Sequence, residues 1–162
     1  DWDLIAVRKG ERLINMDAQA PNRVFEEWAR AGQFLPDVTA VRREYVYGDS
    51  RLDFCLETPR GRHLVEVKGV TLEENGAALF PTERGVKHIR ELMRAVEEGL
   101  DATLFFVIQM ENICAMSPND KTHPAFGAAL REAAQAGVGI CARMCAVEPD
   151  TLVMAGPVPV IL

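Results

Sequence analysis

Apolar and polar residues alternate with a period of two in two neighbouring segments, 52–57 and 63–69, and this alternation predicts two β-strands. Between them, Thr58-Pro59-Arg60-Gly61 has the composition of a tight turn, so the two strands should form a hairpin. Every second residue from Leu52 to Leu56 is large and apolar, which gives the first strand one strongly apolar face. The second strand has valines at 65 and 67, which favours an interior position in the sheet over an edge.

The register of this hairpin brings two acidic side chains together. If Glu57 pairs with Arg62 across the four-residue turn, Asp53 falls directly opposite Glu66, about 5 Å away. Like charges at that distance repel, and Lys68, two residues along on the same strand face as Glu66, can offset the repulsion. An acid facing Glu-x-Lys is the arrangement that metal-dependent phosphodiester cleavage uses, because two carboxylates hold a divalent cation beside a lysine. A solvated surface hairpin with scattered charges is the alternative.

The rest of the chain has the periodicity of three helices and several strands. Helices are expected at 23–31, 83–98 and 124–136, strands at 4–7, 42–47, 102–109, 138–147 and within the tail 152–162, an irregular loop at 72–81 and a turn at 117–120. The uninterrupted apolar run 103–108 predicts a strand that is buried on both faces. In this order, the elements indicate an α/β fold with a mixed central sheet flanked by helices.

Length and composition are those of one globular domain, because the chain has 162 residues, 48% of them hydrophobic and 26% charged. No apolar run is long enough to span a membrane and residues 1–20 lack the layout of a signal peptide, so a soluble, cytoplasmic protein without a membrane partner is expected. The net charge of −6 argues against tight non-specific binding of nucleic acid, although a cation at an acidic site would restore positive charge locally. The four cysteines include no C-x-x-C pair, which argues against zinc.

Six separated motifs carry a family resemblance. They are Ser50-Arg-Leu-Asp-Phe54, Val65-Glu-Val-Lys-Gly-Val-Thr71, Ala78-Leu-Phe-Pro81, Thr82-Glu-Arg-Gly85, Lys87-His88 and Ser117-Pro-Asn-Asp120. In this order they resemble the sugar fermentation stimulation protein A (SfsA) family, from about Trp2 to the C-terminus. That family has a C-terminal domain similar to the PD-(D/E)xK nuclease superfamily and is described as DNA-binding. The resemblance implies a restriction-endonuclease-like domain over residues 21–162, and a remnant of an N-terminal OB-like domain with its linker over residues 1–20.

The resemblance also implies a site. Asp53, Glu66 and Lys68 would form the catalytic triad of a nuclease, with Mg²⁺ or Mn²⁺ as its cofactor. Asp53 and Glu66 are the expected metal ligands, and Glu27 on the first helix is the additional acid that many such sites use. In this hypothesis water attacks phosphorus, and Lys68 helps to deprotonate that water or stabilises the developing charge.

Basic residues near these motifs are candidates for contact with nucleic acid. Arg84 and Lys87 begin the second helix, after the Glu-x-Lys strand, and are expected to contact phosphates. Arg51 and Arg23 complete the predicted nucleic-acid-binding set. His88, in the same helical turn, is a further candidate for a general base. A solvated polar helix face is the alternative explanation of these residues.

The sequence departs from the family pattern in two places. The OB-like segment that precedes the nuclease-like domain in the family is almost wholly missing, which removes a platform for nucleic acid. The family's Phe-Pro is usually followed by a few more residues, including an acid, before Thr-Glu-Arg-Gly, whereas Pro81 directly precedes Thr82 here.

Three functions are compatible with these residues. The preferred one is a metal-dependent nuclease of the SfsA family that binds nucleic acid, expected to be DNA, and hydrolyses phosphodiester bonds. The second is a non-catalytic DNA-binding regulator of sugar (maltose) metabolism genes, which uses the same fold as a scaffold. The third is a protein-interaction module with a vestigial site. Metal dependence distinguishes the first two, because a regulator should bind DNA equally well in the presence of a chelator.

Overall fold

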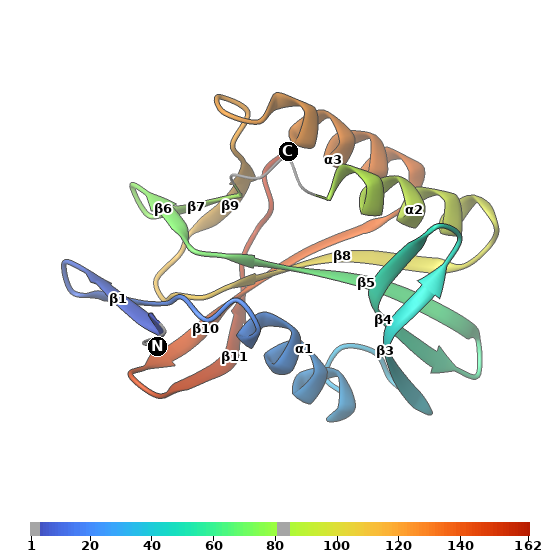
Figure 1. The fold of residues 1–162 in the computed structure, drawn as a ribbon, viewed down its shortest axis with the longest axis horizontal. Helices are drawn as coiled ribbons and strands as arrows, with labels where there is room; N and C mark the ends of the chain where they lie inside the picture. The colour runs from blue at the N-terminus through green and yellow to red at the C-terminus, as the bar shows by residue number, and fades with distance from the viewer. Residues whose placement is uncertain (1–3, 81–84) are drawn as a thin grey trace.

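The computed structural model describes residues 4–80 and 85–162, which form a central six-stranded sheet with helices on both faces (Figure 1). In chain order the elements are β1 (Ala6–Lys9), β2 (Arg12–Asn15), α1 (Ala20–Arg30), β3 (Ala40–Tyr47), β4 (Ser50–Thr58), β5 (Gly61–Val70), β6 (Leu72–Glu74), β7 (Ala77–Phe80), α2 (Val86–Glu97), β8 (Asp101–Ile108), β9 (Ala115–Pro118), α3 (Pro124–Ala136), β10 (Gly139–Glu148) and β11 (Thr151–Pro157). Among these described residues, no helix is both long enough and apolar enough to cross a membrane.

The six-stranded sheet is mixed. Its strand order is β11-β10-β8-β5-β4-β3. Three of the inner strands, β5, β8 and β10, run parallel to one another, and the other neighbouring pairs are antiparallel. Each parallel step is bridged by a helix, α2 between β5 and β8 and α3 between β8 and β10, as parallel strands require. The predicted mixed α/β fold is therefore confirmed.

The core lies on both sides of this sheet. Leu104 and Phe106 of β8 belong to one apolar cluster, beneath α2 and α3, while Phe105 and Val107 belong to the other, beneath α1. Every residue of β8 after Asp101 is buried, which confirms the strand that the apolar run predicted. The neighbouring strand β5 pairs with β8 on one side and with β4 on the other, so side chains on β5 have fixed positions.

The hairpin of β4 and β5 has the predicted register. Glu57 pairs with Arg62, and the ladder extends from Thr58–Gly61 as far as Phe54–Val65. It stops one pair before Asp53 and Glu66, so β4 separates from β5 where these two acids face each other.

The ladder between β3 and β4 is also interrupted at Asp53. Tyr45 pairs with Leu52 and Arg43 with Phe54, but the intervening pair is absent, and Glu44 has a positive φ of 50°. Because of this distortion, Leu52 packs in the cluster beneath α2 and α3, while Phe54 packs in the cluster beneath α1. The prediction of a single apolar face along this strand is wrong at this bend.

Two segments expected to be irregular form strands. Residues 72–80 are a hairpin of β6 and β7, because Asn75 and Gly76 both adopt positive φ, as a tight two-residue turn requires. The strand β7 then pairs with β9, which includes Ser117 and Pro118 of the expected turn. The result is a second, three-stranded sheet.

The observed helix boundaries and chain ends are closer to the predicted ones than these two segments are. α1 begins three residues earlier than predicted, and α3 has the predicted bounds and ends at Gly137. The start of the second helix was predicted at Glu83, which lies outside the described residues. The tail forms the edge strand β11, and the N-terminal strand is one half of the β1–β2 hairpin.

Glu73 attaches this N-terminal hairpin to the rest of the protein. Its carboxylate lies 2.8 Å from Lys9 Nζ and 2.9 Å from an Arg12 guanidinium nitrogen, and it accepts the Gly76 N–H at 2.6 Å. These contacts, with the Lys9 bond the largest cause, lower the pKa of Glu73 to about 2. The ionised carboxylate of Glu73 therefore has these partners in the folded state and lacks them in the unfolded chain.

Replacing Glu73 by glutamine should lower the free energy of unfolding at neutral pH, because the two ion pairs are lost. A carboxyl whose pKa falls from 4.5 to about 2 on folding stabilises the fold above pH 4.5 and loses that contribution as the pH drops toward 2. The difference between wild type and Glu73→Gln in urea unfolding should therefore shrink over that range. The neighbouring exposed Glu74→Gln is the control, and equal urea midpoints for Glu73→Gln and wild type at neutral pH would contradict the prediction.

Candidate active site

Asp53, Glu66 and Lys68 come together where β4 separates from β5. The backbone N–H of Asp53 points to Glu66 Oε2 at 3.3 Å, and the carboxylate of Asp53 accepts the Val67 N–H at 2.8 Å. Lys68 Nζ lies 2.7 Å from Glu66 Oε1. Glu66 is only 3% exposed, so the alternative of a solvated surface hairpin is wrong.

The start of α2 leaves room for Lys68. Gly85, the residue before the helix, has a φ of 111°, which side chains other than that of glycine rarely adopt. A Cβ at this position would lie 3.1 Å from Lys68 Cε and 3.4 Å from its Nζ. Glycine therefore lets the lysine lie directly against the first turn of α2, between the helix and Glu66.

Two polar residues from the helices hold the two acids. Asn22, in the first turn of α1, donates from Nδ2 to Asp53 Oδ1 at 3.1 Å. His88, in the first turn of α2, places Nδ1 2.6 Å from Glu66 Oε1. Because α1 and α2 cover opposite faces of the sheet, the acids lie between the starts of two helices (Figure 1). No role was predicted for Asn22, and His88 was expected only as a candidate general base.

The ionised form of Asp53 is destabilised at this site. Burial, and after it the charge of Glu66, raise the pKa of Asp53 to about 6, although the bonds from Val67 and Asn22 and the charge of Lys68 act in the opposite direction. Ionising Asp53 in the folded protein is therefore unfavourable compared with ionising it in the unfolded chain.

This donor set fits a hard divalent cation. Carboxylate oxygens are the ligands that Mg²⁺ and similar ions prefer, and a positive charge between Asp53 and Glu66 would remove their repulsion. Within residues 4–80 and 85–162 no group of three or more His, Cys, Asp or Glu side chains is arranged to hold a metal. Mg²⁺ often uses one or two carboxylates and completes its shell with water and substrate phosphates, so the pair is sufficient for such an ion.

The structure does not bring Glu27 to this pair. It follows Asn22 by five positions, which turns it roughly 140° around the helix. Its exposed side chain lines pockets between α1 and the β10–β11 hairpin, together with Thr151, Leu152 and Met154 among others. Glu26 is no replacement, because it pairs with Arg30 and Arg43. The predicted third acid on the first helix is thus not part of the arrangement.

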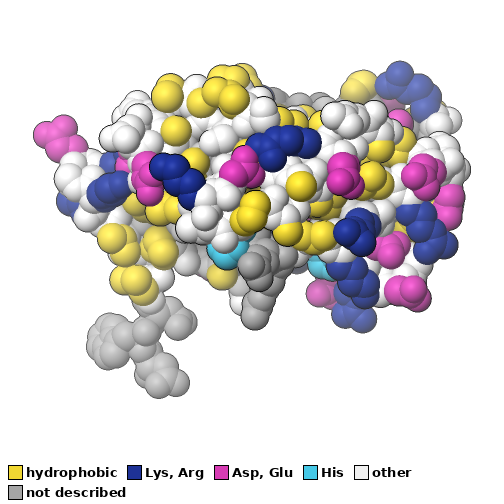
Figure 2. All heavy atoms as spheres, turned by 90° about the horizontal axis from the view of Figure 1, so that it is seen from above, with side chains coloured by type: hydrophobic (Ala, Val, Ile, Leu, Met, Phe, Trp, Pro, Cys, Tyr) yellow, Lys and Arg dark blue, Asp and Glu magenta, His cyan; other side chains and the backbone are white. Residues whose placement is uncertain are grey.

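The predicted nucleic-acid contacts fall into three groups. Lys87 and Arg51 are exposed, and Lys87 Nζ donates to the Asp49 carbonyl at 3.1 Å. Arg23 forms an ion pair with Asp17, so its charge is already compensated. Arg84 lies outside the described residues. On the face that α2 and α3 cover, basic and acidic side chains are interspersed (Figure 2).

Gln109 supports the site indirectly. It is 2% exposed, and its Nε2 lies 2.9 to 3.1 Å from oxygens of Asn15 and Asp17, in the segment that leads into α1. A Cβ on Gly69 would lie 2.5 Å from Gln109 Oε1 and 2.7 Å from Pro21 Cγ. Gly69 therefore allows the start of α1, and with it Asn22, to pack closely against the end of β5.

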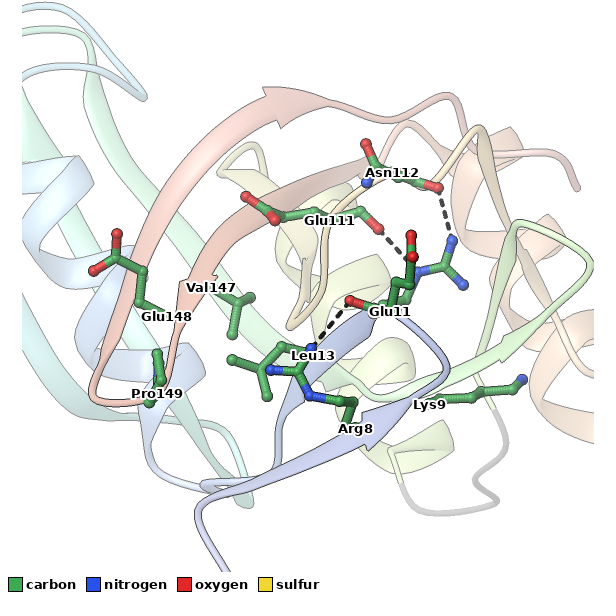
Figure 3. Close-up of a pocket in the computed structure, with 10 residues that line it drawn as sticks. Arg8, Lys9, Glu11, Leu13, Glu111, Asn112, Val147, Glu148 and Pro149 are labelled. Carbon is green, nitrogen blue, oxygen red and sulfur yellow. Dashed lines mark hydrogen bonds between the residues drawn. The ribbon is translucent and has the colours of Figure 1, made fainter.

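A pocket larger than the two beside Glu27 lies away from the acids. It has a volume of about 730 Å³ and opens between the β1–β2 hairpin, the loop after β8 and the β10–β11 turn (Figure 3). Its wall carries charges of both signs, those of Arg8 and Arg12 as well as those of Glu111 and Glu148. Asp53, Glu66 and Lys68 do not line it, so we do not identify it with the active site.

The protein is of the mixed α/β class, with the half-buried Asp53 and the buried Glu66 beside a lysine. Its family follows from comparison with known proteins. The sequence model described as "Sugar fermentation stimulation protein RE domain" matches residues 19–151. The sugar fermentation stimulation protein homologue of Desulfitobacterium hafniense is 52% identical over 154 residues, which are 93% of this chain and 67% of that protein. That of Clostridium beijerinckii is 48% identical over 164 residues, covering 99% and 73%. The chain belongs to the sugar fermentation stimulation protein (SfsA) family.

A solved structure has the same fold. The structure of Pyrococcus furiosus SfsA in complex with Ca²⁺ superposes with a TM-score of 0.90 at 27% sequence identity, over 98% of this chain and 71% of that one. The family resemblance drawn from the separated motifs is confirmed. These relatives are longer than the present chain, which spans about two thirds to three quarters of their length.

Replacing Asp53 by asparagine should stabilise the cation-free protein at neutral pH. Because folding raises the pKa of Asp53 from 3.8 to about 6, the folded state binds the proton more tightly, and the free energy of unfolding falls as the pH rises from about 4 to about 6. At neutral pH this effect lowers the free energy of unfolding by at most about 2–3 kcal/mol.

Urea unfolding in the presence of a chelator measures this effect. Asp53→Asn should be more stable than wild type at neutral pH, by about 1–2 kcal/mol, and the difference should vanish below about pH 4. Asp150→Asn, in the exposed β10–β11 turn, is the matched control. A wild-type stability that rises between pH 4 and 6 relative to Asp53→Asn would show that the predicted sign is wrong.

Proposed function

We propose that this chain binds nucleic acid and hydrolyses phosphodiester bonds with the help of a divalent cation held by Asp53 and Glu66. The observation that carries the proposal is the placing of the half-buried Asp53 next to the buried Glu66, with Lys68 alongside. Without a cation, the charge of Asp53 opposes folding, because burial and the charge of Glu66 raise the pKa of Asp53.

Two findings support the divalent cation. The donor set consists of carboxylate oxygens at a point where the sheet opens, and the related P. furiosus protein was solved in complex with Ca²⁺. Ca²⁺ and Mg²⁺ share a preference for oxygen ligands. We propose Mg²⁺ or Mn²⁺ as the working ion, since a smaller ion with few protein ligands leaves positions for water and for a phosphate oxygen.

The chain's own residues have separable roles in this proposal. A bound cation would supply Lewis acidity to the phosphoryl group and to the attacking water. Asp53 and Glu66 would bind it, and Asn22 would keep the Asp53 carboxylate in place. The Lys68 ammonium lies on the same side and would stabilise the negative charge that develops on the phosphoryl oxygens as water attacks phosphorus. The proton of the water passes to solvent or a neighbouring base, and the leaving oxygen takes a proton from solvent.

DNA is the proposed polymer, bound by a small basic rim. Lys87 and Arg51 are exposed, Lys87 next to His88 in the chain and Arg51 two residues before Asp53, and both can contact phosphates. With a net charge of −6, the chain should bind DNA weakly by itself and lose affinity steeply with salt.

A non-catalytic DNA-binding regulator of sugar (maltose) metabolism genes is the second candidate. The observation that favours it is that Lys68, His88 and the backbone already satisfy the oxygens of Glu66, so the site is structurally complete without an ion. In this alternative the fold is a scaffold, and a chelator leaves DNA binding unchanged.

Cleavage of labelled single- and double-stranded DNA and RNA in the presence of Mn²⁺ tests the proposal. Asp53→Ala and Lys68→Ala should each lower the rate by about 100-fold or more, because one removes a ligand and the other the neighbouring positive charge. Glu27→Ala should leave the rate within about threefold of wild type, since its side chain lies on another flank of α1.

The outcomes separate the candidates. Cleavage that continues in excess chelator, or that Lys68→Ala leaves unchanged, contradicts the proposed chemistry. Absence of cleavage by the folded protein with Mg²⁺ and Mn²⁺, together with chelator-resistant DNA binding, places the regulator first.

A further inference from the structure

Two donors converge on a single oxygen of Glu66. Lys68 Nζ lies 2.7 Å and His88 Nδ1 2.6 Å from Oε1, whereas Oε2 is reached by the Asp53 N–H at 3.3 Å. The two oxygens of this buried carboxylate are therefore not equivalent. Oε1 is turned toward α2 and its donors, and Oε2 toward Asp53.

We propose that His88 is a positioning residue, which donates its Nδ1–H to Glu66 Oε1 and so presents Oε2, together with Asp53, to a divalent cation. This inference rests on the proposed function, because it assumes that the two acids hold a cation. It assigns to His88 no contact with the substrate and no transfer of a proton.

The packing of α2 explains why His88 can do this. The ring stands in the first turn of the helix, next to Ile89, which is fully buried and fixes the helix on the sheet with Leu92. Lys68, by contrast, approaches Oε1 at the end of four rotatable bonds. The histidine is thus the donor with the less adaptable position, and it decides which way the carboxylate faces.

Lys68 alone would hold the carboxylate less well. An ammonium has three donors and no preferred plane, so it can pair with either oxygen of Glu66 or lie between both. In that position it would compete with a cation for Oε2. A second donor on Oε1 keeps the lysine on that oxygen, so Oε2, which among the described residues accepts only the Asp53 N–H, keeps a lone pair for an ion. Hydrogen bonds of this kind to a liganding carboxylate typically account for about 10–100-fold in metal affinity.

Two amide substitutions can test whether the Nδ1–H is the group that matters. The side-chain amide nitrogen of asparagine occupies nearly the position of Nδ1, and that of glutamine nearly the position of Nε2. His88→Asn should therefore keep the bond to Glu66, while His88→Gln, of similar polarity and greater length, should not.

Binding of Ca²⁺ to the whole chain, measured by calorimetry without any nucleic acid, is the experiment. The dissociation constant should rise about 10–100-fold in His88→Ala and His88→Gln, and His88→Asn should stay within about threefold of wild type. Arg90→Ala, at an exposed position of the same helix, is the control, and thermal unfolding of each variant shows whether it is folded. If His88→Ala does not fold, the comparison of the asparagine and glutamine variants carries the test.

Each result has a distinct meaning. Wild-type binding that His88→Ala and His88→Gln leave unchanged overturns the positioning role and leaves the proposed function intact. Equal weakening in the asparagine and glutamine variants also overturns it, because the donor at Nδ1 is then not the cause. Failure of the wild type itself to bind Ca²⁺ or Mn²⁺ removes the proposed function, and the role of His88 with it.

Nitrogen-15 spectra of the histidine rings provide a readout that needs no metal. His88 should carry a proton on Nδ1, whose signal should change in Glu66→Gln. A ring protonated on Nε2 alone would overturn the assignment of His88 as the donor.

Discussion

The repulsion between the neighbouring carboxylates of Asp53 and Glu66 is the constraint on which the rest of this structure depends. Two acids directly opposite each other, one of them buried, are unfavourable in an unbroken ladder without offsetting charge, and here both ladders of β4 omit the pair at Asp53. The strand bends at that point, and the opening receives an amide from α1 and a lysine and an imidazole from the side of α2. The architecture around the site therefore follows from the need to hold two like charges.

A fold can tolerate such a site only if its stability comes from elsewhere. Here β8 provides it, because seven consecutive residues after Asp101 are buried between two apolar clusters on opposite faces of the sheet. β5, which carries Glu66 and Lys68, pairs with β8 over its whole inner length. Glu66 thus stands on a strand that pairs with the buried strand β8, so its carboxylate cannot turn out into solvent.

The sequence was sufficient for the parts of the site that depend on local pairing. A four-residue turn and strict alternation determined the register, which placed Asp53 against Glu66 and Lys68 on the face of Glu66. The prediction for Glu27 was wrong because it depends on more than local pattern. The apolar stripe of α1 shows which side of the helix faces the sheet, but not which flank faces Asp53. The β7–β9 pairing was missed for the same reason, because it joins segments more than 30 residues apart that no local pattern relates.

The residues that sequence analysis missed are also those that give the acids their orientation. Asn22 and His88 stand in the first turns of two helices that approach the sheet from opposite faces, so only the tertiary arrangement brings them to the same pair. A common hairpin with an acid opposite Glu-x-Lys has no such partners, and its side chains reach solvent. Burial of Glu66, a glycine that makes room for Lys68 and a separate donor for each acid together distinguish a built site from a chance motif. This is why the structure strengthens the case for a cation site even though it removes the third acid.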